Sequence, residues 1–251
     1  MSHRPIALVT GASRAKGIAA AVVAALAADG WDIATSYWRA YDAEWPYGSA
    51  SGEAEGVLDV ARTAGARAFG MEADLADPET PPRVFDRVEA ELGGVRALVL
   101  SHCVSVDSGI EDTTVESFDR HFDVNTRASW LLVRELGRRF SGPFGSGRII
   151  ALTSDDVVGN IPYGASKGAL DRIVLAAARE FAETGITSNV LNPGPVDDGW
   201  MSEQLKEELR DLTPLGRLGT TRDPANIVRF LCSEEGGWVN GQLIKSNGGI
   251  N

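Results

Sequence analysis

The amino-acid sequence predicts a single α/β domain built on a doubly wound, seven-stranded parallel sheet with helices on both faces. Short apolar segments alternate with longer helical patterns along all 251 residues, as they do in successive βαβ units. Two of these segments, 97–100 and 149–152, are continuously apolar, which is typical of parallel strands buried on both faces. The length suits one large domain, residues 1–251, and is short for two.

The expected elements alternate in order. Strands are expected at 5–10, 31–37, 67–71, 96–101, 147–153, 187–191 and 241–246. Helices are expected at 17–29, 52–64, 79–92, 115–139, 162–183 and 223–232. Two segments break the rhythm: an aromatic loop at 38–50, and 193–219, where a Pro/Gly turn precedes a polar helix around 201–212. Ligands bind beyond the carboxyl ends of parallel strands, so both segments are expected near a ligand, and 193–219 is expected to form a substrate lid.

Charge and composition narrow the possible partners. The formal net charge is −11, which disfavours nucleic acid or an anionic membrane and leaves a small molecule as the expected partner. Cys103 and Cys232 lack the spacing of a metal or disulfide motif, and only three histidines are present, so no metal site is predicted. The apolar run 6–9 is too short for a signal peptide, and no segment is long enough to span a membrane. A cytoplasmic protein is therefore expected.

A glycine-marked turn follows the first expected strand. Gly11 permits a tight turn, and Gly17 opens the helix expected at 17–29. The first amides of a helix in this position can bind a pyrophosphate. The position after a strand and before a helix favours a dinucleotide site over a surface turn.

Charge at the end of the second strand distinguishes the two nicotinamide cofactors. An acidic residue there favours NAD, whereas an arginine favours NADP. Arg39 follows this strand, no acid occurs until Asp42, and Arg14 lies in the glycine turn. NADPH is therefore expected, with Arg14 and Arg39 at its phosphate, and NADH remains the alternative. Asp74 and Leu75, just past the third strand, are expected either to contact the adenine or, for Asp74, to cap the next helix.

Tyr163 and Lys167 form the most informative pair in the chain. They are four residues apart in an expected helix, so their side chains share one face. A nearby ammonium lowers the pKa of a phenol, which would make Tyr163 a proton donor near neutral pH. Together with the glycine turn, the pair predicts hydride chemistry on a nicotinamide cofactor.

The whole chain resembles the classical short-chain dehydrogenase/reductase family, and in particular sequences described as 3-oxoacyl-ACP reductase-like. The residues on which the resemblance rests are Thr10–Arg14, Asn125, Ser154, Tyr163, Lys167, Asn192–Gly194, Asn240–Gln242 and Asn247–Gly249. The resemblance implies a Rossmann-like fold and a homo-oligomer, either a tetramer or a dimer. It also implies that the protein binds the cofactor and positions the substrate, while the cofactor supplies the hydride.

The resemblance assigns four catalytic residues. Tyr163 would be the general acid toward a carbonyl oxygen, and Ser154 would hydrogen-bond that oxygen. Lys167 would bind the nicotinamide ribose and lower the Tyr163 pKa, and Asn125 would hold a water for a proton relay. Three residues separate the tyrosine from the lysine, whereas related enoyl reductases usually have six, so the resemblance favours carbonyl reduction.

Cofactor contacts are expected over much of the chain. The residues assigned to them are Gly11, Ser13, Arg14, Gly17, Ile18, Arg39, Asp74, Leu75, Ser101, His102, Tyr163, Lys167, Pro193, Gly194 and Val196. His102 has two readings, a catalytic residue near the cofactor or a hydrogen-bonded structural residue.

Four features depart from the family pattern. The glycine turn has one extra residue, and Ala19 stands at the place of its usual last glycine. Ser101-His102-Cys103-Val104 replaces the family's Asn-Asn-Ala-Gly loop, and the segment 154–163 is about four residues shorter than usual. Asp198 stands where a threonine often contacts the nicotinamide carboxamide. These departures put the shape of the phosphate loop and the ribose contacts in question.

Three functions remain after this reading. The first is an NADPH-dependent reductase that converts a ketone, of 3-oxoacyl, polyketide or secondary-metabolite type, to a secondary alcohol. The second is an NAD-dependent alcohol dehydrogenase working in the opposite direction. The third is a non-catalytic dinucleotide-binding sensor or scaffold.

Overall fold

A seven-stranded parallel sheet forms the centre of the structure, a computed structural model that describes residues 4–45 and 48–250. Its strand order is β3-β2-β1-β4-β5-β6-β7, and neighbouring strands are parallel throughout. The strands are β1 (Ile6–Thr10), β2 (Asp32–Tyr37), β3 (Ala68–Glu72), β4 (Val95–Leu100), β5 (Arg148–Leu152), β6 (Thr187–Asn192) and β7 (Leu243–Lys245). The predicted doubly wound sheet is confirmed.

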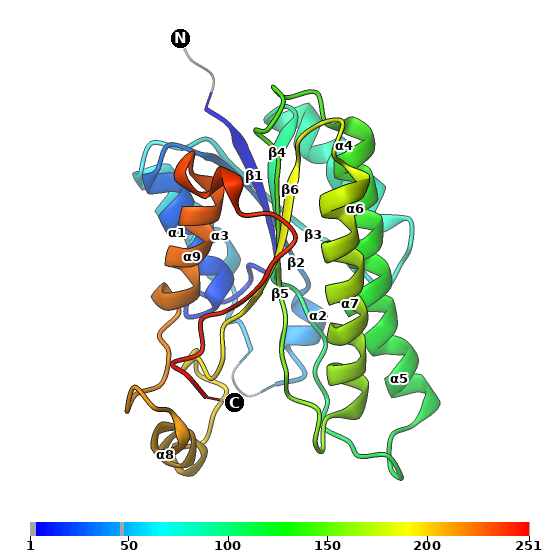
Figure 1. The fold of residues 1–251 in the computed structure, drawn as a ribbon, viewed down its shortest axis with the longest axis vertical. Coiled ribbons are helices and arrows are strands. Elements are labelled where there is room, and N and C mark those ends of the chain that lie inside the picture. The colour runs from blue at the N-terminus through cyan, green and yellow to red at the C-terminus, as the bar shows by residue number, and fades with distance from the viewer. Residues whose placement is uncertain (1–3, 46–47, 251) are drawn as a thin grey trace.

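Helices cover both faces of this sheet (Figure 1). One layer contains α1 (Ile18–Ala28), α3 (Glu53–Thr63) and α9 (Arg222–Cys232); the other contains α4 (Thr80–Glu91), α6 (Ala128–Arg139) and α7 (Ile161–Glu180). Each layer has its own hydrophobic core against the sheet. Adjacent residues of a strand serve different cores, because successive side chains point to opposite faces: Leu8 packs with Phe85 and Leu132, and Val9 with Leu26 and Leu231.

The expected helix 115–139 is divided into three parts. It consists of α5 (Val115–His121), a π-helical segment, η1 (Phe122–Arg127), and α6. Thr114 caps α5, since its hydroxyl accepts a hydrogen bond from Ser117 N at 3.1 Å. The prediction of one continuous helix missed this π-turn, and such turns often occur at functional sites.

Segments 38–50 and 193–219, which interrupt the alternation of strands and helices, each contain a short helix. The expected loop 38–50 begins with α2 (Arg39–Asp42), while its residues 46–47 lie outside the described residues. The polar helix expected in 193–219 is α8 (Glu203–Leu212). A 3-10 turn, η2 (Glu235–Trp238), was not predicted.

The position of a ligand site follows from the strand order. The chain runs outward from β1 to β3 and then crosses back to place β4 on the other side of β1. A crevice forms beyond the carboxyl ends of β1 and β4 at such a switch point. None of the described helices is long and apolar enough to cross a membrane.

Candidate active site

The glycine turn and the loop after β4 are in close contact at the switch point. Gly11 has φ +73°, and a Cβ there would lie 2.7 Å from His102 Cα. The backbone amides of Gly11 and Ala12 donate to Ser36 O of β2, at 2.8 and 3.1 Å. A glycine is therefore required at position 11, both for the positive φ and for the approach of the two loops.

His102 is held by hydrogen bonds on both ring nitrogens. Its Nδ1 lies 2.7 Å from Thr10 Oγ1, and its Nε2 lies 3.0 Å from Val124 O. Because a carbonyl can only accept, these partners place the proton on Nε2. Burial, and then the nearby Lys167 charge, lowers the pKa of His102 to about 3. A neutral, hydrogen-bonded imidazole supports the structural reading of His102 over the catalytic one.

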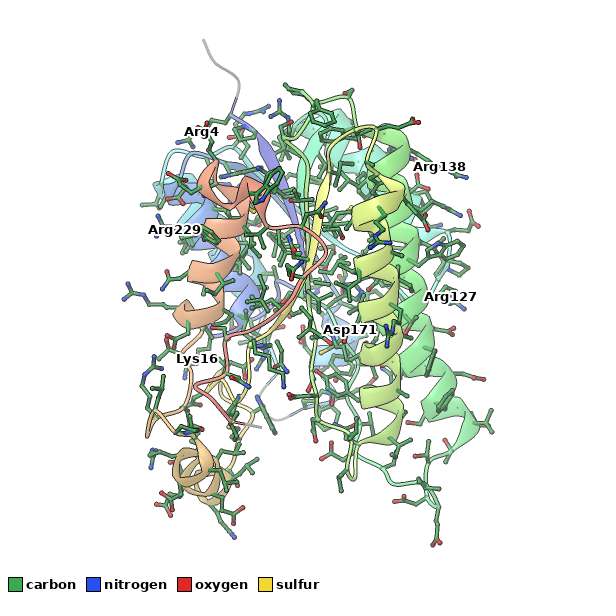
Figure 2. The ribbon with its side chains drawn as sticks, in the orientation of Figure 1. Arg4, Lys16, Arg127, Arg138, Asp171 and Arg229 are labelled. Carbon is green, nitrogen blue, oxygen red and sulfur yellow. The ribbon has the colours of Figure 1, made fainter. Side chains whose placement is uncertain are left out.

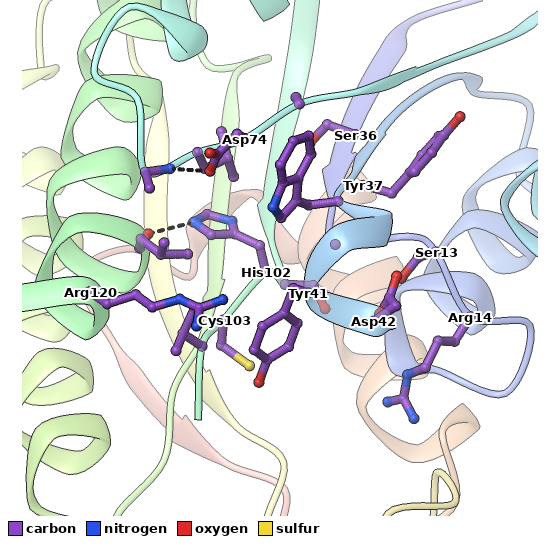
Figure 3. Close-up of a pocket in the computed structure, with 18 residues that line it drawn as sticks. Ser13, Arg14, Ser36, Tyr37, Tyr41, Asp42, Asp74, His102, Cys103 and Arg120 are labelled. Atoms are coloured by element: carbon purple, nitrogen blue, oxygen red, sulfur yellow. Dashed lines mark hydrogen bonds between the residues drawn. The ribbon is translucent and has the colours of Figure 1, made fainter. Parts of the chain in front are cut away.

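A pocket of about 230 Å³ opens beside these loops (Figure 3). Its lining comes from the glycine turn, the end of β2 with α2, the loop after β3, the loop after β4, and α5 with η1. The lining residues are Gly11, Ser13, Arg14, Ser36, Tyr37, Trp38, Tyr41, Asp42, Ala73, Asp74, Leu75, Ala76, Ser101, His102, Cys103, Val104, Arg120 and Val124. The volume is below the ~300–1,000 Å³ of pockets that enclose a whole drug-sized ligand, so the pocket fits part of a dinucleotide.

Tyr41 connects the two sides of this pocket. Its hydroxyl accepts a hydrogen bond from Ser105 N at 3.1 Å. Its ring lies beneath the Arg120 guanidinium, 5.6 Å from the ring centroid, and Arg120 also pairs with Glu44 at 3.0 Å. Tyr41 thus lines the pocket and also bonds segment 38–50 to the loop after β4 on its opposite side. Arg120 has no signal in the sequence, because it is one of several charged residues on an ordinary amphipathic helix.

The catalytic candidates of β5 and α7 gather beyond the loop that follows β4. Pro162 in the first turn of α7 suits a helix start, and Tyr163 and Lys167 follow on one face. Lys167 is 3% exposed, and its Nζ donates to Leu152 O at 2.9 Å while lying 5.7 Å from the Tyr163 ring centroid. Ser154 hydrogen-bonds Tyr163, so the predicted group of three is brought together.

The electrostatics of this group differ from the expectation. Burial raises the pKa of Tyr163 well above the ordinary value of a phenol, and the hydrogen bond with Ser154 opposes that rise only in part. Burial also lowers the pKa of the Lys167 ammonium. The net shift at Tyr163 is therefore opposite to the predicted lowering, because the cost of removing a phenolate from water outweighs the one opposing contribution, the hydrogen bond with Ser154.

Asn125 fastens the loop after β4 to α7. Its Oδ1 accepts from Val104 N at 2.7 Å, and its Nδ2 donates to Val104 O and Ser166 Oγ, both at 2.9 Å. Ser166 Oγ in turn donates to Tyr163 O at 2.7 Å. Both amide hydrogens are used in this network, so the π-helical residue positions the backbone around Tyr163. Its role in holding a water remains a prediction.

The two arginines expected at a phosphate have different positions. Arg14 lines the pocket and forms an ion pair with Asp198 at 2.7 Å, which joins the glycine turn to the lid segment. Arg39 lies outside the pocket lining, is 61% exposed, and pairs with Glu72. Asp42, by contrast, is buried and lines the pocket.

The remaining cofactor candidates lie around the same crevice. Asp74 and Leu75 line the pocket, and Asp74 Oδ1 accepts from Ala76 N at 2.9 Å. Since α4 begins only at Thr80, Asp74 does not cap it. Gly17 is the N-cap of α1, and Ile18 is its first residue.

Segment 193–219, the expected lid, approaches the C-terminal residues of the chain. Gly194, with φ +64°, follows Pro193, and a Cβ there would lie 2.4 Å from Asn247 Cβ. Val196 is buried and forms a bridge with Gly219 that closes the base of the lid. These residues do not line the 230 Å³ pocket.

Orphaned polar atoms test whether the crevice fits a dinucleotide. Ser36 Oγ lines the pocket side of β2 and is buried without a hydrogen-bond partner among the described residues, as is Asp198 Oδ1 at the lid. Buried polar groups normally have partners, and a ribose hydroxyl and a carboxamide supply such partners. Together with Arg14 at the pocket edge, these atoms fit a nicotinamide dinucleotide.

Three comparisons agree on the kind of protein. A family model described as enoyl-(acyl carrier protein) reductase matches residues 11–251. The uncharacterised oxidoreductase YjdA of Bacillus subtilis is 35% identical over 257 residues, covering 100% of this chain and 99% of YjdA. A short-chain dehydrogenase/reductase of Serratia marcescens has a TM-score of 0.87 and 28% identity, covering 100% of this chain and 99% of its own. The angucycline C-6 ketoreductase LanV, solved with bound NADP, has a TM-score of 0.85 and 31% identity, covering 98% of this chain and 95% of its own. The chain therefore belongs to the short-chain dehydrogenase/reductase family of oxidoreductases.

Proposed function

We propose that this protein is an NADPH-dependent reductase that converts a ketone to a secondary alcohol. The observation that supports it best is the grouping of Ser154 and Tyr163 with the buried Lys167, in which the phenol is hydrogen-bonded to the serine and the ammonium lies over the phenol ring. The cofactor, when bound, supplies a hydride to the carbonyl carbon. Tyr163 gives its hydroxyl proton to the carbonyl oxygen, so that one hydride and one proton complete the alcohol.

Tyr163 carries the proton that ketone reduction needs, because burial keeps the pKa of its phenol above the ordinary value. The same hydroxyl would accept a proton in alcohol oxidation, so the direction of reaction is set by the supply of reduced or oxidised cofactor. Ser154 orients the carbonyl oxygen toward this hydroxyl, and Asn125 keeps the backbone around Tyr163 in place through Ser166.

The preference for NADPH is supported by Arg14 and by a relative. Arg14 is a cation at the edge of the pocket, paired with Asp198, and its guanidinium could also donate to a 2′-phosphate. LanV, similar over nearly the whole chain, was solved with NADP. Arg39 can join this site only by leaving Glu72.

The lid gives an indication of the substrate. Trp200, Leu212 and Leu215 are 48%, 67% and 69% exposed on segment 193–219, and no residue of α8 is buried. Exposed apolar side chains beside an active site are suited to cover an apolar ligand. We therefore propose a diffusible, largely apolar ketone of the polyketide or secondary-metabolite type as the substrate, in preference to a highly charged one.

The test is a ketone panel with a Tyr163→Phe variant. Consumption of NADPH should fall by roughly 10²–10⁴-fold in the variant, while NADPH binding, followed by quenching of tryptophan fluorescence, stays within a factor of two or so of wild type. Unchanged turnover in Tyr163→Phe would contradict the mechanism. Binding of NADPH without turnover of any carbonyl would instead favour the sensor or scaffold function.

An NAD-dependent alcohol dehydrogenase is the second candidate, and Asp42 favours it. This carboxylate, the last residue of α2, lines the pocket beyond β2, where it could accept a hydrogen bond from a ribose 2′-hydroxyl. Separate fluorescence titrations with NADPH and NADH distinguish the two: tighter NADPH binding supports Arg14 as the deciding residue, and tighter NADH binding supports Asp42.

A further inference from the structure

A second cavity, of about 320 Å³, lies at the amino-terminal ends of the strands and is lined by three arginines. Arg4 precedes β1, Arg67 precedes β3, and Arg96 lies in β4. The cofactor crevice lies beyond the opposite ends of these strands. Figure 2 shows this separation, with Arg4 at the amino-terminal end of β1 and Lys16 of the glycine turn toward the other end. The proposed reductase chemistry makes no use of this second cavity.

A bulge in the sheet places Arg96 at the cavity. Ile6 of β1 pairs with Val95, whereas the next residue, Ala7, pairs with Ala97. Arg96 is therefore an extra residue with no partner on β1, and such bulges redirect a side chain. Val95 and Ala97 consequently pack into different cores although they are two residues apart.

The charges around the cavity do not balance. The buried Asp32 carboxylate neutralises Arg67: its Oδ1 accepts from Arg67 N at 2.9 Å and its Oδ2 from Arg67 Nε at 2.7 Å. Arg4 and Arg96 also line the cavity, and Arg4 Nη1 is buried without a hydrogen-bond partner among the described residues. In a chain with net charge −11, two cations at one cavity with no ion-pair partner in the described part of the chain call for an anion, because like charges repel and a buried donor needs an acceptor.

We propose that this cavity binds a phosphate-type oxyanion, either inorganic phosphate or the phosphate group of a small organic ester. Guanidinium groups suit this chemistry, since their planar forks donate paired hydrogen bonds to phosphate oxygens. Arg4, just before β1, and Arg96, in the neighbouring strand β4, supply the charge. Arg67, already fixed by Asp32 and by its bond to Leu92 O at 3.0 Å, forms the rigid third side.

The test is isothermal titration calorimetry of the full chain with inorganic phosphate and, separately, with phenyl phosphate. Saturating NADPH is present so that neither probe enters the cofactor crevice. Arg4→Gln and Arg96→Gln should each weaken binding roughly tenfold or more. Arg138→Gln, which removes the same charge from an exposed position on α6, should leave binding unchanged. Tighter binding of phenyl phosphate identifies an ester as the ligand, and equal or tighter binding of inorganic phosphate identifies the free ion.

Two results would overturn the proposal. One is the absence of binding for both probes at millimolar concentration. The other is equal affinity in Arg4→Gln, Arg96→Gln and wild type. Arg67 is left intact because its loss would strand the buried Asp32 carboxylate. If Arg96→Gln fails to fold, as seen by circular dichroism, Arg4→Gln, which lies outside the strands, decides the outcome.

Discussion

Replacing Gly11 by alanine tests the close contact on which the crevice is built. Gly11 has φ +73°, and an added Cβ would lie 2.7 Å from His102 Cα and 2.8 Å from His102 N. The obstructing atoms are backbone, so they cannot rotate away. The left-handed conformation costs an L-residue about 1–2 kcal/mol, and overpacking against fixed neighbours costs about 1–3 kcal/mol more.

Gly30 provides a matched control for this substitution. It also has a positive φ, +90°, but a Cβ there meets nothing within 4 Å. Gly30→Ala should therefore show only the conformational cost of about 1–2 kcal/mol. Gly11→Ala should be less stable than Gly30→Ala by about 1–3 kcal/mol, which in a domain of this size lowers the melting temperature by a further ~2–12 °C.

Thermal unfolding followed by circular dichroism measures this difference, and titration with NADPH measures its consequence for the site. Because the added methyl group pushes the loop after β4 away from the glycine turn, NADPH binding should weaken in Gly11→Ala and not in Gly30→Ala. Equal melting temperatures for the two variants would show that the two loops separate freely, and the reasoning from close contact would be refuted.

Three further predictions follow from charge and hydrogen bonding. Burial lowers the pKa of His102 from 6.5 to about 3, so as the pH falls the unfolded chain takes up this proton before the folded chain does. The folded state therefore loses stability below pH ~6.5, by about 3 kcal/mol at pH 4. Urea unfolding measures this loss, which should be absent from His102→Asn. Arg14→Gln should weaken NADPH roughly tenfold while NADH changes little, and Asp42→Asn should weaken only NADH, as measured by fluorescence titration. Tyr41→Phe removes the acceptor of the Ser105 amide, and loss of about 1 kcal/mol should raise the rate of NADPH release about fivefold in stopped-flow experiments.

The sheet and most helices could be predicted because their signals are local. A buried parallel strand such as β4 is continuously apolar, and a helix such as α8 begins at a capping residue, Ser202, whose hydroxyl accepts from Leu205 N at 3.2 Å. The Tyr163–Lys167 pair was equally accessible, since helical spacing alone puts the two side chains on one face. The structure brings these two residues together with Ser154 as predicted.

Features that depend on contacts between distant segments could not be predicted. Arg39 follows the second strand as expected, yet Glu72 of β3 holds it away from the pocket. The ion pair of Arg14 and Asp198 joins residues 184 positions apart, and neither residue type signals the other. The sign of the Tyr163 pKa shift depends on burial, which the spacing of a motif does not contain.

The altered loop after β4 shows how a departure from a family pattern can preserve a site. Its replacement put the ribose contacts in question, but His102 now bridges Thr10 of β1 and Val124 of η1, at 2.7 and 3.0 Å. Ser101 N donates to the same Thr10 hydroxyl at 3.1 Å, and both backbone groups of Val104 bond to Asn125. A loop fixed at each end in this way presents a constant backbone to a ligand, because hydrogen bonds to side chains of the protein set its conformation. Burial keeps the imidazole neutral by lowering its pKa to about 3, so Nδ1 accepts from the Thr10 hydroxyl while Nε2 donates to Val124 O.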